Sequence, residues 1–257
     1  METPPGFQAR EDAPFSEDRL LGGRVRLRQP RRGYRAGMDA ALLAAACGAG
    51  PGERVLDLGC GPGAVLLAAA ARRPGARFTG MERDPDALAL ARANIALNGL
   101  DDRAEAFAGE VSGGFASLGR PRFDEALCNP PFFDDPTALR GPSADRAGAW
   151  LAEDGLRAWI GFLLSAVHDG GRIVLIHRAD RLADILTMLS PKAGSFRIRP
   201  VHAFAEAPAK RVLVQAIRAG KAPLVLLPAL VLHDRSGAKH TAETDLVLRG
   251  DAELGWE

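Results

Sequence analysis

From Glu53 onward the chain alternates short apolar runs with amphipathic stretches. Each run has the length of one buried strand, and the stretches between runs have helical spacing. This alternation is typical of repeated βαβ units, which place parallel strands in one sheet with helices on both faces. We therefore predict an α/β, Rossmann-like fold. The expected strands are Arg54–Leu58, Arg77–Met81, Ala104–Ala108, Phe123–Cys128 and Arg172–His177.

Turn and cap residues help to locate the helices between these strands. Asp84 and Pro85 are predicted to begin one helix as N-cap and first-turn proline. Gly170-Gly171 is predicted to stop a later one. The expected helices are Ala64–Arg73, Asp86–Leu97, Trp150–His168 and Asp180–Leu189.

The last third of the chain has a different pattern. Phe196–Phe204 and Arg211–Ile217 have no helix between them and predict a hairpin, so the sheet is expected to end in an antiparallel pair. By pattern we divide the chain into a flexible leader (residues 1–18), a basic strand and helix extension (19–50), a core (51–220) and a small C-terminal extension (221–257).

Composition excludes several classes of protein. The 257 residues are 47% hydrophobic and 25% charged, which predicts a soluble domain with a substantial core. No apolar stretch reaches membrane-spanning length. Cys47, Cys60 and Cys128 are far apart, and the five histidines show no metal-ligand spacing. We expect no disulfide framework and no metal site, and a reducing cytoplasm suits the chain.

A glycine-rich segment, Asp57-Leu58-Gly59-Cys60-Gly61-Pro62-Gly63, follows the first strand of the core. Glycines there allow a tight turn and a close approach to a ligand. In a dinucleotide-binding fold such a turn meets a pyrophosphate. The acid at the strand end disfavours that ligand and suits one that carries a positive ammonium and sulfonium. We predict that Asp57, Gly59, Gly61 and Gly63 contact such a cofactor.

Two further acids follow the next two strands. Glu82 comes nineteen residues after Gly63 and can accept both hydroxyl hydrogens of a ribose. Glu110 follows the third strand, where its carboxylate can meet an adenine amino group or remain a surface charge. We predict that both acids contact the cofactor, whereas Asp84 is expected only to cap its helix.

The tetrapeptide Asn129-Pro130-Pro131-Phe132 follows the fourth strand. The lone pair of an exocyclic amino group is delocalised into its ring, and two acceptors aimed at the N–H groups can redirect it. The Asn129 side-chain oxygen and the Pro130 carbonyl supply such a pair, the prolines fix the backbone, and Phe132 can stack on the ring. A simple strand-terminating turn is the alternative. His177 is predicted to pack or cap, not to act as a base.

These motifs resemble the class I methyltransferases that depend on S-adenosylmethionine (SAM), in the branch marked by (Asn/Asp)-Pro-Pro-(Tyr/Phe). Residues 22–35, the segment Asp39–Leu43 and the tail Lys210–Gln215 are similar to bacterial valine-tRNA adenine-N6 methyltransferases, which modify the adenine 3′ to the anticodon. The resemblance implies a seven-stranded sheet ordered 3-2-1-4-5-7-6 with an antiparallel last strand. It also implies SAM at the glycine loop and the target adenine at Asn129. Asp39 is expected either to cap the helix that it begins or to lie beside the methionine end of SAM.

A basic segment without acids lies near the N-terminus. Residues 19–35 hold seven arginines, and their alternation predicts a strand face suited to phosphates. A solvated edge strand protected by charge is the alternative. The predicted RNA-binding residues are Arg24, Arg26, Arg28, Arg31, Arg32 and Arg35, and Lys192, Arg197, Arg199, Lys210 and Arg211 are expected to extend the patch.

Several substrates fit the acceptors of the tetrapeptide. We expect adenine-N6 methylation of RNA, most simply tRNA, with no membrane and no obligate protein partner. Asn-Pro-Pro-Phe also occurs in enzymes that methylate guanine N2 of ribosomal RNA, and a protein glutamine amide fits the same acceptors. A SAM-binding scaffold without catalysis is a further alternative, against which the intact Asn129 and Glu82 argue.

Overall fold

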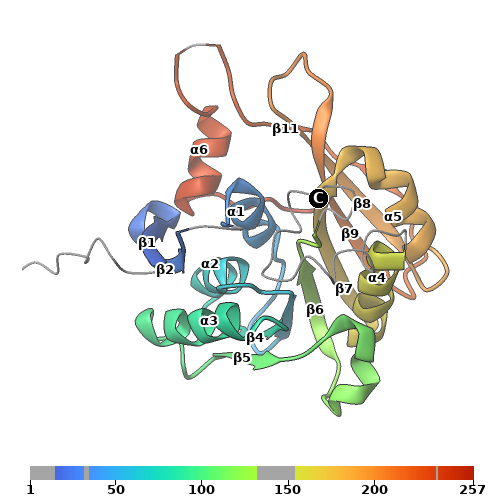
Figure 1. The fold of residues 1–257 in the computed structure, drawn as a ribbon. Coiled ribbons are helices and arrows are strands. Elements are labelled where there is room, and N and C mark those ends of the chain that lie inside the picture. Colours follow the sequence, from blue (N-terminus) through green and yellow to red (C-terminus); the bar gives the residue numbers. More distant parts are fainter. Residues whose placement is uncertain (1–14, 32–34, 132–153, 236) are drawn as a thin grey trace, which may run out of the picture.

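The computed structural model describes residues 15–31, 35–131, 154–235 and 237–257 (Figure 1). Its main sheet contains the strands in the order β5-β4-β3-β6-β7-β9-β8, and β9 is antiparallel to both of its neighbours. This is the predicted order 3-2-1-4-5-7-6 with an antiparallel last strand. The strands are β3 (Arg54–Leu58), β4 (Arg77–Glu82), β5 (Ala104–Ala108), β6 (Phe123–Cys128), β7 (Val167–Arg178), β8 (Ala193–His202) and β9 (Ala209–Arg218).

Helices cover both faces of this sheet (Figure 1). Alternate strand residues point to opposite faces, so Val55 packs with one buried cluster and Leu56 with the other. The first cluster includes residues of α1 (Met38–Ala45), α2 (Ala64–Arg72), α3 (Pro85–Leu97) and α6 (Ala242–Arg249). The second includes residues of α4 (Asp154–Ala166) and α5 (Leu182–Leu189).

Helix α3 begins as the sequence predicts. The Asp84 carboxylate accepts hydrogen bonds from the N–H groups of Asp86 and Ala87, each at 2.9 Å, and Pro85 occupies the first turn. The helix ends at Leu97, and Gly99 follows with φ of 62°. Asp84 therefore caps the helix and fixes the turn that leaves Glu82.

The boundary between α4 and β7 differs from the prediction. The helix ends at Ala166, and Gly170-Gly171 lies inside β7 and does not stop the helix. The pairing of β6 with β7 shifts register between Phe123 and Glu125, which makes a bulge on β7. A Cβ atom on Gly171 would lie 2.9 Å from the carbonyl oxygen of His168. The glycine pair therefore permits this bulge. The first four residues of the predicted helix, 150–153, lie outside the described residues.

The N-terminal region forms a hairpin. Strand β1 (Phe15–Leu20) pairs antiparallel with β2 (Val25–Pro30) through the 3-10 turn η1 (Leu21–Gly23). The prediction of a flexible leader up to residue 18 is thus wrong for residues 15–18. The sequence of β1, FSEDRL, does not alternate apolar and polar residues. The strand forms by pairing with β2, whose Val25 and Leu27 are buried.

Two asparagines, Asn94 of α3 and the C-cap Asn98, hold this hairpin. The buried Asn94 amide accepts from the Arg28 N–H at 2.9 Å and donates to the carbonyls of Arg28 and Pro62 at 2.8 and 2.9 Å. One turn later, Asn98 makes the same pair of bonds with the backbone of Arg26, at 2.9 and 2.7 Å. The side chains thus satisfy the edge of β2, and Asn94 links the hairpin to the glycine loop.

The C-terminal segment packs onto the core. Strands β10 (Val225–Leu226) and β11 (Leu230–Val231) run parallel to β8 and extend that edge of the sheet. After α6 the chain returns to α1, where the Trp256 indole N–H donates to the Ala46 carbonyl at 2.8 Å. Leu254 and Trp256 belong to the first buried cluster, so the predicted extension contributes to the core.

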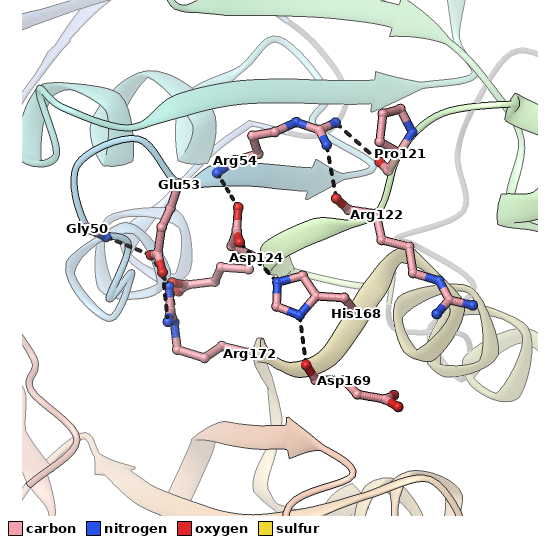
Figure 2. A network of polar contacts seen from close by, with 10 residues as sticks. Gly50, Glu53, Arg54, Pro121, Arg122, Asp124, His168, Asp169 and Arg172 are labelled. Carbon is pink, nitrogen blue, oxygen red and sulfur yellow. Dashed lines mark hydrogen bonds and ion pairs between the residues drawn. The ribbon is translucent and has the colours of Figure 1, made fainter.

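A polar network lies at the edge of the sheet where β3 and β6 begin (Figure 2). The Asp124 carboxylate accepts from the Arg54 N–H at 2.8 Å, and His168 lies 3.0 Å from the same carboxylate. Arg172 of β7 ion-pairs with Glu53 and donates to the fully buried Glu125 at 2.9 Å. This network joins the starts of three neighbouring strands at the edge opposite the two motifs.

Candidate active site

The two sequence motifs leave neighbouring strands at the same edge of the sheet. Strands β3 and β6 are parallel, and Leu58 pairs with Cys128. Gly59 and Asn129 follow these paired residues directly, as the sequence predicts. Strand β4 lies on the other side of β3, so the chain connections diverge between β3 and β6. Ligands of open α/β sheets bind at this kind of switch point.

Three glycines of the loop have backbone angles that other residues rarely adopt. Gly59, Gly61 and Gly63 have φ values of 71°, 53° and 92°, in the region that favours glycine. The N–H groups of Gly59 and Cys60 donate to the Met81 carbonyl at 2.9 and 3.0 Å. A Cβ on Gly61 would meet no described atom within 4 Å. The loop is thus fixed to the end of β4 and leaves open space at Gly61.

Two carboxylates accept hydrogen bonds from backbone N–H groups in and around the glycine loop. Asp57 is buried and accepts from the Leu66 N–H in the first turn of α2 at 3.0 Å. Burial raises the pKa of Asp57 to about 7, and the nearby Glu82 carboxylate adds to this rise. Glu82 accepts from the Gly61 N–H at 2.9 Å and from the N–H groups of Arg83 and Asp84 at 2.8 Å.

These hydrogen bonds determine which ligands the glycine loop can accept. A pyrophosphate binds through a free helix N-terminus and glycine-loop N–H groups. Here the carboxylates of Asp57 and Glu82 already accept from N–H groups of this kind, and the negative charge of Glu82 repels an anion. A ligand with cationic groups is favoured instead. The residues therefore fit the ammonium and sulfonium of SAM better than they fit a dinucleotide.

The other predicted cofactor residues occupy different surroundings. Exposed Glu110 follows β5 and accepts from the Ser112 hydroxyl at 3.2 Å, while Gly109 donates to the Glu82 carbonyl at 3.1 Å. Asp39 does not cap α1, because the helix begins at Met38 and Gly37 is its N-cap. Its carboxylate instead pairs with Arg211 of β9 at 2.9 Å. The cofactor roles of Glu110 and Asp39 remain predictions.

The tetrapeptide is described up to its third residue. Asn129 is half-buried, Pro130 is buried and Pro131 is exposed. Phe132, the predicted stacking residue, lies outside the described residues. The Cys128 thiol donates to the Leu58 carbonyl at 3.7 Å, which ties the ends of β6 and β3 together.

Trp159 is a site residue that the sequence did not indicate. Its half-buried indole projects from α4 onto Gly59. A Cβ on Gly59 would lie 2.4 Å from the Trp159 Cη2 atom and 2.8 Å from Cζ3. The only signal in the sequence is a large aromatic residue on the helix after the tetrapeptide, and that pattern also describes an ordinary core residue.

His177 packs inside β7, as predicted. It is 3% exposed, and burial lowers its pKa to about 4, with the charge of Arg181 lowering it further. The imidazole is therefore neutral at physiological pH. It lies in the sheet and pairs in register with Val212 of β9.

The predicted RNA-binding arginines have carboxylate partners. Glu17 of β1 pairs with Arg26 at 2.8 Å and with Arg28 at 3.3 Å. Asp18 pairs with Arg35 at 2.6 Å, and Arg24 pairs with Asp251. Arg31 is exposed after β2, and Arg32 lies outside the described residues. The acids come from outside the acid-free segment, so this face is less positive than its own sequence suggests.

Known proteins match the chain in sequence and in structure. Residues 37–144 match the methyltransferase small domain family. A tRNA1(Val) (adenine(37)-N6)-methyltransferase of Porphyromonas gingivalis is 34% identical over 187 residues, which cover 70% of this chain and 72% of that protein. The chain belongs to the SAM-dependent methyltransferases. A solved structure from Agrobacterium tumefaciens, described as a predicted O-methyltransferase, has a TM-score of 0.69 and 26% identity, and covers 84% of this chain and 98% of its own.

A shorter match is to a relative that is named for a different substrate. A release factor glutamine methyltransferase of Caulobacter vibrioides is 42% identical over 78 residues, but these cover only 30% of this chain and 26% of that protein. Among the described residues, no helix is long and apolar enough to cross a membrane, and no group of His, Cys, Asp and Glu is arranged to hold a metal ion.

SAM is the cofactor of this methyltransferase, and Glu82 provides a test of how the loop holds it. We expect Glu82→Gln to weaken SAM binding about 10-fold, or about 1.4 kcal/mol, because the substitution removes a charge and one acceptor beside Gly61. Isothermal titration calorimetry measures the affinity. Glu105→Gln, at an exposed acid on β5, is the matched control. Equal affinities for the two variants would contradict a cofactor role for Glu82.

Proposed function

We propose that the protein methylates N6 of an adenine in tRNA, in the anticodon-loop region. The observation that carries this proposal is the register of β3 with β6, in which Leu58 pairs with Cys128. Asn129 and Gly59 follow these paired residues, so the tetrapeptide starts beside the glycine loop. The relative named as a tRNA adenine-N6-methyltransferase supports it, because the match extends over more than two thirds of both chains.

The acceptors at the start of the tetrapeptide explain the chemistry. SAM supplies a methyl group already activated by its sulfonium. The Asn129 side-chain oxygen and the Pro130 carbonyl accept from the two N–H groups of the adenine amine and direct its lone pair outward. The N–C bond then forms as the C–S bond breaks, and the methylated nitrogen afterwards loses a proton to solvent.

Positioning is the main contribution of the chain's own residues. Holding two reactants in line is worth about 7–11 kcal/mol, and no general base is required for this transfer. Pro130 is buried and has no N–H, so the carbonyl beside Asn129 is held by a stiff backbone.

Trp159 contributes a wall to the same site. Its ring contacts Gly59 from α4, so it lies at the start of the glycine loop on the face of the sheet covered by α4. An indole face attracts cations and excludes water. We assign it the role of closing this side of the SAM pocket.

The hairpin supplies a first RNA contact. Arg28 lies beside the glycine loop, because Asn94 bonds both the Arg28 backbone and the Pro62 carbonyl. Its ion pair with Glu17 and that of Arg26 are partly exposed. Such pairs are weak, so a phosphate can replace the carboxylate as the partner of each guanidinium.

Neutralising these two arginines tests the contact. We expect Arg26→Gln with Arg28→Gln to weaken tRNA binding and to reduce the slope of log affinity against log salt by about 1.5, because two phosphate contacts are lost. Fluorescence anisotropy over a salt titration measures the slope. Arg77→Gln, at an exposed arginine where β4 begins, is the control. An unchanged slope in the double variant would remove the hairpin from the RNA surface.

One assay separates the substrate classes. The enzyme is incubated with labelled SAM and, separately, with unmodified tRNA, ribosomal RNA and release factor. We expect label in tRNA and N6-methyladenosine after nucleoside digestion. Label in the release factor alone would refute the RNA substrate, and N2-methylguanosine would refute the adenine assignment.

A further inference from the structure

Four planar side chains lie in a row on two loops that follow β8 and β11, with the Phe204 and His233 rings tilted by 46° and the two histidines stacked. The Phe204 and His233 ring centroids lie 5.6 Å apart, and His233 stacks on His240 at 5.2 Å with an interplanar angle of 26°. On Phe204 lies the guanidinium of Arg235, 5.3 Å from the ring centroid. We call these four residues, Arg235, Phe204, His233 and His240, the aromatic ladder.

The ladder lies at the same edge of the sheet as the two motifs. Strand β7 is parallel to β6, so both end at that edge. Strand β9 is antiparallel to β7 and therefore begins there, and β8, antiparallel to β9, ends there. Strand β11 is parallel to β8 and ends there as well. In Figure 1 the loops after β8 and β11 lie at the top, the end toward which β6 points.

The ladder lies within reach of an RNA strand that is bound at the target site. Strands β7 and β9 separate β6 from β8. Three strand spacings amount to roughly 14 Å across the sheet. Through the strand registers Cys128 is level with Ile198, so β8 ends at His202 about three residues, or roughly 10 Å, farther along than Asn129. The ladder follows His202, and an RNA strand with its target adenine at Asn129 therefore reaches it with bases a few nucleotides away.

Hydrogen bonds hold the ladder in place. His233 Nδ1 lies 2.6 Å from the Lys239 carbonyl, so the ring donates to it. The Arg235 Nε donates to Glu206 at 2.9 Å, which fixes the guanidinium plane over Phe204. The two loops are joined where the His233 N–H donates to the Ala203 carbonyl at 2.9 Å. The planar groups are thus arranged before any ligand arrives.

Core packing does not account for these residues. Phe204, His233 and His240 are half-buried, and the Arg235 side chain is 77% exposed. Phe204 belongs to neither of the buried clusters formed by the described residues. The Nδ1 atom of His240 is buried and has no hydrogen-bond partner among the described residues. Exposed Lys210 and Lys239 add positive charge at the same edge.

We infer that the aromatic ladder is a stacking site for unpaired RNA bases a few nucleotides from the target adenine. Unpaired bases stack on aromatic rings and on arginine planes. The Arg235 side chain is largely exposed above Phe204, so its guanidinium plane is accessible to a base without rearrangement. This inference rests on the proposed RNA substrate and adds a second contact to it, independent of the hairpin.

Phe204→Leu tests the inference on the full-length enzyme with unmodified tRNA. We expect the tRNA dissociation constant to rise about 5- to 150-fold, the range for losing one stacked base. The salt slope should stay unchanged because no phosphate contact is lost. SAM affinity and the melting temperature should also stay unchanged, and Phe204→Trp should retain binding. Arg235→Gln, at an exposed side chain, should weaken tRNA binding in the same direction.

The outcomes are separable. Unchanged tRNA affinity in both Phe204→Leu and Arg235→Gln would overturn the stacking site while leaving RNA methylation intact. A loss of SAM affinity or melting temperature that parallels the loss of tRNA affinity would show a structural role and would also overturn it. If the wild-type enzyme methylates release factor and no RNA, the proposed function fails first, and the inference fails with it.

Discussion

Asn129→Ala is expected to lower kcat for tRNA methylation by about 10²–10³-fold, the usual cost of removing one positioned polar partner from a reacting centre. Asn129 directly follows the strand that pairs with the end of β3, so its side chain lies at the junction with the glycine loop. Without its oxygen, one N–H of the target amine has no acceptor, and the lone pair stays delocalised. Single-turnover kinetics with saturating tRNA measure the chemical step directly.

Two comparisons make this test specific. SAM affinity should be retained in Asn129→Ala, because Asp57, Glu82 and the glycine loop are untouched. Asn129→Asp keeps an acceptor oxygen at the same position and should retain more turnover than the alanine variant. If Asn129→Ala turned over tRNA at the wild-type rate, Asn129 would have no part in the mechanism.

The sequence predicted most of the parallel core. Strands β3, β5 and β6 have the predicted bounds, and the Asp84 cap is confirmed. These features are local, because buried parallel strands are continuous apolar runs and an N-cap acts within its own turn. The adjacency of Gly59 and Asn129 was also predictable, because it follows from strand order once the resemblance to a known family is recognised.

The errors arise where distant segments decide the outcome. Gly170-Gly171 was interpreted as a helix stop, but it forms a bulge whose shape depends on Asp124 of the neighbouring strand. Residues 15–18 lack an apolar pattern, and their strand forms by pairing with β2. The basic face was predicted from an acid-free segment, and its partner Glu17 lies just outside that segment.

Site residues were missed for the same reason. Trp159 is 100 residues from Gly59 in sequence, and the aromatic ladder joins Phe204 to residues of a loop about thirty positions later. No spacing rule connects such positions. Only the order of β6, β7, β9 and β8 brings the ladder to the edge that carries Asn129.

Arg172→Met is expected to lower the free energy of unfolding by about 3–5 kcal/mol, the cost of leaving a buried charge without its partner. Arg172 donates to Glu125, whose side chain has no exposed surface, and also pairs with Glu53 (Figure 2 shows the Glu53 contact). Burial raises the pKa of Glu125, and Arg172 and the Gly48 N–H oppose that rise. Removing Arg172 therefore raises this pKa further. Urea denaturation followed by circular dichroism measures the loss.

Two matched measurements distinguish a buried-charge effect from lost packing. A group whose pKa is higher in the folded than in the unfolded protein stabilises the fold below its unfolded value, and that stability is lost as pH rises through the folded pKa. The loss of unfolding free energy in Arg172→Met should thus shrink as pH falls toward 4.5, the ordinary pKa of Glu125.

The second measurement uses a double variant. Adding Glu125→Gln removes the charge and keeps an acceptor for the Gly48 N–H, 3.0 Å away, so the double variant should recover most of the loss. A pH-independent deficit that Glu125→Gln does not relieve would assign the effect to packing. In either case the folded variant should bind SAM normally, because this network lies at the edge of the sheet opposite Gly59 and Asn129.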